Sequence, residues 1–142
     1  MEELFELRSH IEHGRYSEAL TLIGEMEEMS KDDKINKIES YIEILLLHVI
    51  KQHAEKRSTR SWDVSISNAA TKIRNTNKRR KSGGCYLTKE DIKEAIAEAW
   101  PVALRRASLE AFEGRYDESE IAQRIDKGAI LQEALQLIDQ SV

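Results

Sequence analysis

The segment from Ile35 to Lys56 constrains the fold of this chain more than any other stretch of its sequence. Its apolar residues recur at the three-and-four spacing that keeps one face of an α-helix away from water. They are Ile35, Ile38, Ile42, Leu45, Leu46, Val49 and Ile50. Ile44 and Leu47 add apolar side chains to the opposite face. A helix that is apolar all round is normally covered by other helices, so the segment predicts the centre of a helical bundle.

Composition and patterning both favour an all-α protein. The 142 residues include one Pro and six Gly, whereas a β-sandwich needs many turn residues. No stretch shows the strict apolar–polar alternation of a half-buried strand. We therefore expect a single domain over residues 1–142, a bundle of about six or seven helices around a central buried helix at about residues 31–56.

Capping signals divide the first part of the chain into two segments. Residues 2–29 have the pattern of a helical hairpin, with Gly14 at its turn because glycine accepts the positive φ of a helix end. Residues 30–81 have the pattern of a central helix pair. We expect Ser30 to begin the first helix of this pair and the second to begin near Thr59 or Ser61.

The second part of the chain begins with a loop. Residues 82–87 include a Ser-Gly-Gly sequence, which predicts a flexible joint. Residues 88–142 then carry the C-terminal helices, the first of which has a capping residue in Thr88. Pro101 lacks a backbone donor and disfavours α geometry at Trp100, so it predicts a kink or break there.

Charge is segregated along the chain. Residues 1–50 carry five basic and twelve acidic side chains, residues 51–81 carry ten and two, and residues 82–142 carry seven and twelve. The net charges of the three segments are therefore −7, +8 and −5. A basic centre between acidic ends either attracts other parts of its own chain or faces a polyanion, and charge counts do not separate these alternatives.

Several features predict a cytoplasmic protein. The sequence begins with acidic residues, unlike a secretory or transit signal. Its longest apolar run, Ile44–Leu47, is too short to span a bilayer, so we expect no membrane association. A single cysteine, Cys85, excludes an intrachain disulfide and fits a reducing compartment.

His48 is the most informative single residue for function, because it lies inside the predicted apolar core. A histidine there can serve as a base, a ligand or a polar anchor. We favour the simpler interpretation of a core histidine whose ring N–H meets a carbonyl or hydroxyl group. No set of His, Cys, Asp and Glu has the spacing of a metal site, so we expect no metal and no cofactor.

Two basic stretches are further candidates for a binding site. The first contains Trp62 and the cations before it, Lys51, Lys56, Arg57 and Arg60, and cations beside an aromatic ring suit contact with phosphate. The alternative that we favour makes Trp62 a core side chain and pairs Arg60 with an acidic residue of the first hairpin. The second stretch is four consecutive cations, Lys78, Arg79, Arg80 and Lys81. They are the strongest indication of nucleic-acid binding, although a solvated helix end is the simpler interpretation.

A family resemblance rests on Leu45-Leu46-Leu47-His48-Val49-Ile50-Lys51 followed by Arg60-Ser61-Trp62. The sequence resembles a bacterial, mainly cyanobacterial, family catalogued as domain of unknown function number 29. Its pattern is a leucine-rich helix with a Leu-His-x-x-Lys step, a short polar spacer, and Arg-x-Ser-Trp or a close variant. The resemblance implies an all-helical fold and no particular activity. It marks His48, Lys51, Arg60, Ser61 and Trp62 as the positions that carry the pattern here.

Three functions remain open. We favour a non-enzymatic helical protein that binds a protein partner or a second copy of itself, since no P-loop, Rossmann or nucleophile-elbow motif occurs. The first alternative is a nucleic-acid-associated protein that uses residues 51–81. The second is a small hydrolase or nuclease with His48 as base and Lys51 or Arg60 stabilising an anion. That activity needs a cleft in which the three side chains converge.

Overall fold

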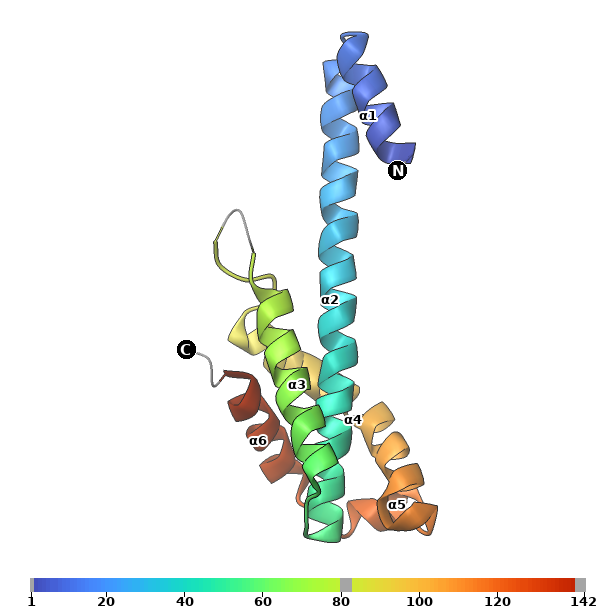
Figure 1. The fold of residues 1–142 in the computed structure, drawn as a ribbon, viewed down its shortest axis with the longest axis vertical. Coiled ribbons are helices and arrows are strands. Elements are labelled where there is room, and N and C mark those ends of the chain that lie inside the picture. The colour runs from blue at the N-terminus through green and yellow to red at the C-terminus, as the bar shows by residue number, and fades with distance from the viewer. Residues whose placement is uncertain (1, 80–82, 140–142) are drawn as a thin grey trace. The chain divides into compact units, whose positions relative to one another are not determined.

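The structure is a computed structural model that describes residues 2–79 and 83–139. The expected all-α fold is confirmed, because this described part contains helices and one isolated β-bridge but no strand (Figure 1). The α-helices are α1 (Glu2–Glu12), α2 (Tyr16–Glu55), α3 (Arg60–Asn77), α4 (Lys89–Glu110), α5 (Glu118–Ala122) and α6 (Lys127–Asp139). A short 3-10 segment, η1 (Ala111–Gly114), separates α4 from α5.

The central helix is longer than the sequence indicates. The expectation that Ser30 begins a new helix is wrong, because α2 continues unbroken from Tyr16 to Glu55 over 40 residues. A serine in a helix interior costs only a few tenths of a kcal/mol, and no proline interrupts the segment. Neither α2 nor any other helix of the described residues holds an apolar stretch long enough to cross a membrane.

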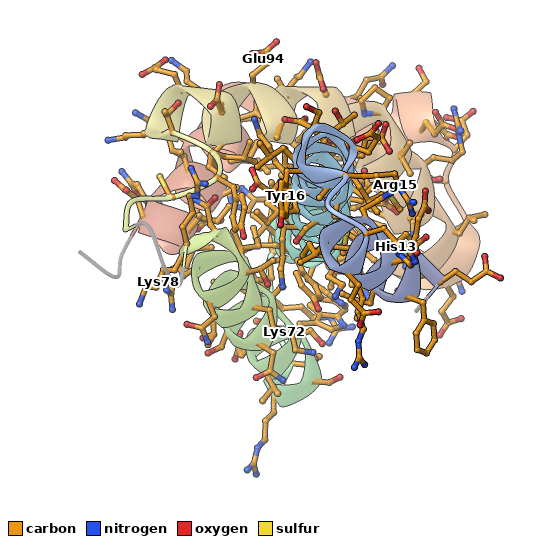
Figure 2. The ribbon with its side chains drawn as sticks, turned by 90° about the horizontal axis from the view of Figure 1, so that it is seen from above. His13, Arg15, Tyr16, Lys72, Lys78 and Glu94 are labelled. Carbon is orange, nitrogen blue, oxygen red and sulfur yellow. The ribbon has the colours of Figure 1, made fainter. Side chains whose placement is uncertain are left out.

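The chain divides into two compact units, Met1–Lys34 and Ile35–Val142. The first unit contains α1 and the beginning of α2, joined by the turn in which His13 and Arg15 lie (Figure 2). As expected, Gly14 has a positive φ of 73°. The Arg15 N–H donates to the His10 carbonyl at 2.8 Å and the Gly14 N–H to that of Ile11 at 3.2 Å. This pair of bonds is the Schellman arrangement that ends a helix at glycine.

The second unit contains one continuous hydrophobic core. The C-terminal part of α2 lies at its centre, where Ile38, Ile42, Leu45, Leu46, Val49 and Ile50 are completely buried. The predicted buried helix is thus confirmed over this range. Buried side chains of α3, α4 and α6 complete the core, and α6 packs against α3 (Figure 1). Glu94 points away from these helices on the outer side of α4 (Figure 2).

Most of the predicted helix starts are confirmed by their caps. The Thr59 hydroxyl accepts from the Trp62 N–H at the start of α3. Thr88 and Asp91 form a complete capping box at the start of α4. A break at Pro101 does not occur, because α4 continues from Lys89 to Glu110. Core packing explains why the helix survives there, since Trp100 and Ala103 on either side of the proline are both buried.

Candidate functional site

Lys51 brings together parts of the chain that are far apart in sequence. It is the one charged residue that is buried in the described part of the chain, with 5% of its surface exposed, and it projects from the last turns of α2. Its Nζ lies 2.9 Å from Glu110 Oε1, at the end of α4. The same Nζ lies 4.7 Å from the centre of the Trp62 ring, in the first turn of α3. The ammonium group therefore has a carboxylate partner and an aromatic partner.

Trp62 is half-buried and its ring contacts two cations. Arg57 Cζ is 4.9 Å from the ring centre, in addition to the contact with Lys51. The N-terminal cap of α3 fixes the backbone at this position, because the Trp62 N–H donates to Thr59 Oγ1 at 3.1 Å. Trp62 is therefore neither a fully buried core residue nor a free surface ring. Its ring packs against the Lys51 and Arg57 side chains.

A left-handed turn closes the other side of this region. Phe112, Glu113 and Gly114 have φ values of 52°, 57° and 78°, and for the two non-glycine residues such values are uncommon. Glu55 holds the turn from α2, since its Oε2 accepts from the Phe112 N–H at 3.2 Å. Its other oxygen accepts from Arg57 at 2.9 Å. Strained backbone of this kind persists only where the surrounding contacts enforce it.

An open cleft of about 470 Å³ lies between these groups, and we call it the Lys51 cleft. Its lining combines three cations, Lys51, Arg57 and Arg115, with three carboxylates, Glu55, Glu110 and Glu113, and two rings, Trp62 and Phe112. The formal charges balance, and Lys51 and Glu55 are already engaged with neighbours. Such a lining offers little net attraction for a phosphate. These contacts instead hold together the end of α2, the start of α3 and the end of α4 with the turn that follows it.

His48, Arg60 and Ser61 carry the family pattern but do not line the Lys51 cleft. His48 is half-buried, and its Nδ1 is buried without a hydrogen-bond partner among the described residues. The expected carbonyl or hydroxyl partner is therefore missing at this atom. Arg60 and Ser61 are exposed. Within the described part of the second unit, Arg60 has no carboxylate within ion-pair distance, and its expected pairing with the first hairpin stays a prediction.

The surroundings of His48 favour the neutral imidazole. Burial lowers the pKa of its ring below the usual 6.5, and the positive charges of Lys51 and Arg106 lower it further. The negative charge of Glu110 acts in the opposite direction but is weaker than the burial. The neutral imidazole is the form that accepts a proton, but His48 does not line the Lys51 cleft and so is not placed to act as a base on a molecule bound there.

The basic cluster near residue 80 begins at a well-defined hairpin base. Asn77 binds Leu87 twice, since its Nδ2 donates to the Leu87 carbonyl at 3.0 Å and its Oδ1 accepts from the Leu87 N–H at 2.8 Å. The Arg79 N–H donates to the Gly84 carbonyl at 3.1 Å. Lys78 and Arg79 are exposed, and the Arg79 guanidinium lies over the Tyr86 ring. Arg80 and Lys81 fall outside the described residues.

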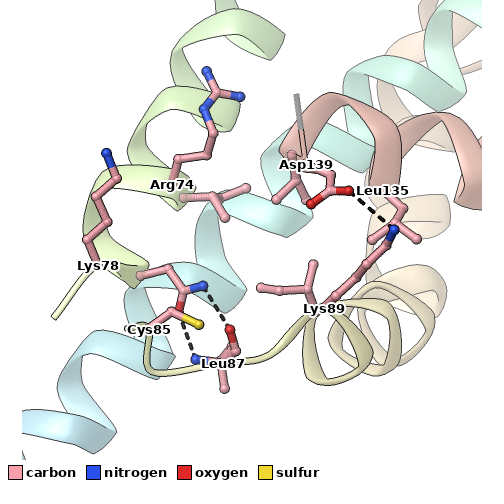
Figure 3. A pocket seen from close by; sticks show the side chains of 11 residues that line it. Arg74, Lys78, Cys85, Leu87, Lys89, Leu135 and Asp139 are labelled. Carbon is pink, nitrogen blue, oxygen red and sulfur yellow. Dashed lines mark hydrogen bonds and ion pairs between the residues drawn. The ribbon is translucent and has the colours of Figure 1, made fainter. Parts of the chain in front are cut away.

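A smaller pocket of about 210 Å³ lies beside this hairpin base, and we call it the cationic pocket (Figure 3). Its apolar wall consists of Ile73, Leu87, Ile92, Leu135 and Ile138. Three cations, Arg74, Lys78 and Lys89, and one carboxylate, Asp139, belong to its polar lining. Lys89 and Asp139 pair across one side at 3.3 Å. Cys85, exposed and reduced, lines the opposite side (Figure 3).

Sequence patterns give no indication of the acidic partner of Lys51. Glu110 lies 59 residues away and appears in the sequence as one carboxylate among many. Glu55 and Phe112 are likewise missed by sequence reasoning, because a left-handed turn at non-glycine residues leaves no reliable sequence signal. No group of His, Cys, Asp and Glu within the described ranges is arranged to hold a metal ion.

Comparison with known proteins agrees with the pattern around His48 and Trp62. A family described as "Domain of unknown function DUF29" matches residues 15–128, which is most of the chain. No curated protein matches the sequence, and no solved structure matches the fold. The Lys51 cleft therefore lies within a region whose family pattern has no activity attached.

Proposed function

We propose that this chain, which belongs to the DUF29 family, is a non-enzymatic helical protein that binds a protein partner through its first unit, Met1–Lys34. The family name carries no function, so the surface of the chain itself has to support a role. One observation carries the proposal: the first unit leaves large apolar side chains in solvent. We further propose that the protein acts in the cytoplasm, which is consistent with its single reduced cysteine.

The exposed apolar side chains are concentrated in the first unit. Helix α1 buries none of its residues, and Phe5 keeps 68% of its surface exposed. On α2, Tyr16 and Leu20 are 64% and 69% exposed and lie one turn apart on the same face. Met29 is 62% exposed on the same helix. Clusters of large apolar side chains on a surface mark protein interaction sites, because water contact with them is unfavourable.

The geometry of the family motif supports binding rather than catalysis. Lys51 is committed to Glu110 and Trp62, which leaves its ammonium group poorly available to a substrate. The hydrolase hypothesis requires His48, Lys51 and Arg60 to converge in one cleft. The Lys51 cleft is lined by neither His48 nor Arg60, so that hypothesis remains a prediction without geometric support.

A variant that removes exposed apolar side chains from both helices of the first unit tests the proposal. Phe5→Ser, Tyr16→Ser and Leu20→Ser together remove three large apolar side chains that contribute little to folding. Self-association is measured by sedimentation equilibrium of the pure chain. Any protein captured from native extract is purified, and its binding to the wild type and to the triple variant is measured by calorimetric titration. We expect the triple variant to raise the Kd of the interaction at least about tenfold, because apolar anchors dominate most interfaces.

A matched control separates this surface from exposed apolar residues in general. Val64→Ser and Leu109→Ser change side chains that are 49% and 72% exposed in the second unit. The pair should bind as the wild type does. A chain that stays monomeric and has no partner sensitive to the triple variant would remove the proposal.

One observation favours nucleic-acid binding as a second candidate. Lys56, Arg60, Lys72, Lys78 and Arg79 have no carboxylate within ion-pair distance in the described ranges. Their charge is thus not neutralised locally. If they meet phosphates, affinity for duplex DNA or RNA should fall steeply with salt and should drop when Lys78 and Arg79 become glutamine. Absent or salt-insensitive binding would dismiss this candidate.

A further inference from the structure

The cationic pocket has the size and lining of a seat for one aromatic ring. Its volume is about 210 Å³, and an apolar cavity of about 150 Å³ already takes up a benzene molecule. Ile73 and Ile92 supply buried apolar surface from α3 and α4, while Ile138 adds surface from α6. The pocket opens to solvent between elements that the hydrophobic core holds in place. An incoming ring would therefore find a preformed site.

The charge around the pocket is positive and only partly neutralised. Asp139 is the one carboxylate in the described lining, and it is paired with Lys89. Arg74 donates to the Leu137 carbonyl, a neutral group, at 2.9 Å. Lys78 has no carboxylate partner within the described ranges and lies at the edge of the pocket (Figure 3). A ring that arrives on an acidic segment gains electrostatic attraction as well as burial.

Helix α1 presents such a ring on an acidic segment. Its apolar stripe consists of Leu4, Leu7 and Ile11, spaced by three and four residues. Phe5 follows Leu4 directly, so it lies about 100° around the helix from that residue. It stands on the charged side of α1 and remains exposed. The helix carries four glutamates and one arginine, which gives it a net charge of −3 when His10 is neutral.

We infer that Phe5 of one copy inserts into the cationic pocket of a second copy of this chain, with the glutamates of α1 facing its cations. The inference rests on the proposed function and names the partner as the chain itself. The match is one of shape and charge, since an acidic helix with one protruding ring meets an apolar pocket with a positive rim. A reciprocal exchange of α1 helices between two copies closes the assembly as a dimer.

Cys85 provides a reporter inside the pocket, because it is the single cysteine of the chain. In one protein, Phe5→Cys is combined with Cys85→Ser, and this protein is mixed with the wild type. Disulfide formation is followed under oxidised glutathione on non-reducing gels, with peptide mapping of the product. In this mixture, the thiol introduced at position 5 and the native Cys85 can only join across two chains. The matched control introduces its thiol through Leu20→Cys in place of Phe5→Cys, at a position that is equally exposed in the same unit.

We expect the thiol at position 5 to link to Cys85 at least about tenfold faster than the thiol at position 20 does. In the reciprocal dimer, Phe5 of the wild-type copy still docks in the pocket of the variant, which raises the effective concentration of the thiol at position 5 beside the wild-type Cys85. Equal rates would show random collision and overturn the inference. A preference for links between two position-5 thiols would point to symmetric pairing of the acidic first units and would overturn it as well. A third result would also overturn the inference: a disulfide between position 5 and Cys85 within one chain of the single Phe5→Cys variant.

Salt dependence provides a second, non-covalent measurement. The wild-type dimer should weaken when salt is raised from about 50 to about 500 mM, because opposite charges meet at the pocket. Symmetric pairing of two acidic units would instead strengthen, since salt screens their repulsion. If no cross-copy link forms and the triple Ser variant still loses a purified partner, the inference fails while the proposed function stands. If the triple variant binds as the wild type does, the proposed function fails.

Discussion

Lys51 and Glu110 form an ion pair whose two ends lie in different environments. The Lys51 side chain is 7% exposed, whereas that of Glu110 is 44% exposed, and Nζ and Oε1 are 2.9 Å apart. The pair connects the end of α2 to the end of α4. Because a buried charge depends on its partner far more than a hydrated one does, the two residues should respond unequally to substitution.

Glu110→Gln should therefore destabilise the fold more than Lys51→Met. The first change leaves a buried ammonium group without its counter-charge and should lower the free energy of unfolding by about 2–3 kcal/mol. The second leaves a carboxylate that water can solvate, and the methionine keeps apolar contact with Trp62, so about 1 kcal/mol is expected. Urea denaturation followed by tryptophan fluorescence reports on the second unit, which contains both tryptophans.

An exposed ion pair serves as the control for this comparison. Arg105 and Glu118 lie 3.2 Å apart, with side chains that are 63% and 46% exposed. Arg105→Gln should cost no more than about 0.5 kcal/mol. The assignment of Lys51 as a buried partner would be wrong if Glu110→Gln proved as mild as this control.

Trp62→Leu should also destabilise the second unit, because the ring contacts the Lys51 and Arg57 side chains. Loss of this contact together with lost apolar burial is expected to cost about 1–3 kcal/mol. Val64→Ala, two residues further on an exposed side of α3, should stay within about 0.5 kcal/mol. Chemical denaturation followed by circular dichroism measures both variants, since Trp62 is itself removed in one. Equal effects at the two positions would argue against a structural role for the ring.

The turn between α4 and α5 offers a gain in stability. Glu113 has a φ of 57°, which glycine adopts without strain. Glu113→Gly should raise the free energy of unfolding by about 0.5–1 kcal/mol, because the strain relieved exceeds the added freedom of the unfolded chain. Gly114→Ala should do the opposite, since its Cβ would meet the Leu109 carbonyl oxygen at 3.1 Å at a φ of 78°.

The matched control for this gain is the same substitution on regular helix. Glu94→Gly on the outer side of α4 should lose about 1 kcal/mol, because glycine is a poor helix former. Thermal unfolding of the three variants gives the comparison. If Glu113→Gly lowered the melting temperature as Glu94→Gly does, the left-handed turn would not be a strained element of the fold.

Local sequence patterns are sufficient for the fold because they report on local physics. The spacing of apolar residues from Ile35 to Ile50 requires a buried helix wherever the rest of the chain goes. Capping residues such as Thr59 and Thr88 act within one turn, so their effect is visible in the sequence itself. Ser30 shows the limit, since a capping residue begins a helix only if the preceding residues are not already helical.

The site is only half predictable for the same reason. Lys51 and Trp62 belong to one pattern, and the short spacer between them allows α3 to fold back beside α2, where their side chains meet. Glu110 reaches Lys51 only after α4 has packed against the core, and no local rule selects it among the other carboxylates. Phe5 stands outside the apolar stripe of α1 in the sequence, but its exposure is evident only in the structure.

His48 should make the stability of the second unit depend on pH. Its folded pKa lies below the unfolded value of about 6.5, because burial and the positive charges of Lys51 and Arg106 disfavour the imidazolium. The unfolded chain therefore binds a proton at this residue before the folded chain does. The contribution of His48 to the free energy of unfolding is fully present above about pH 6.5. It is lost as the pH falls from there through the folded pKa. His48→Gln has no titrating ring, so it should remove this part of the dependence of stability on pH.

Urea denaturation midpoints of the wild type and His48→Gln at about pH 8, 7, 6 and 5.5 test this prediction. The difference at about pH 8, where the ring is neutral in both states, shows the effect of the substitution on packing alone. Parallel pH profiles of the two proteins between about pH 7 and 5.5 would show that the ring titrates normally in the fold.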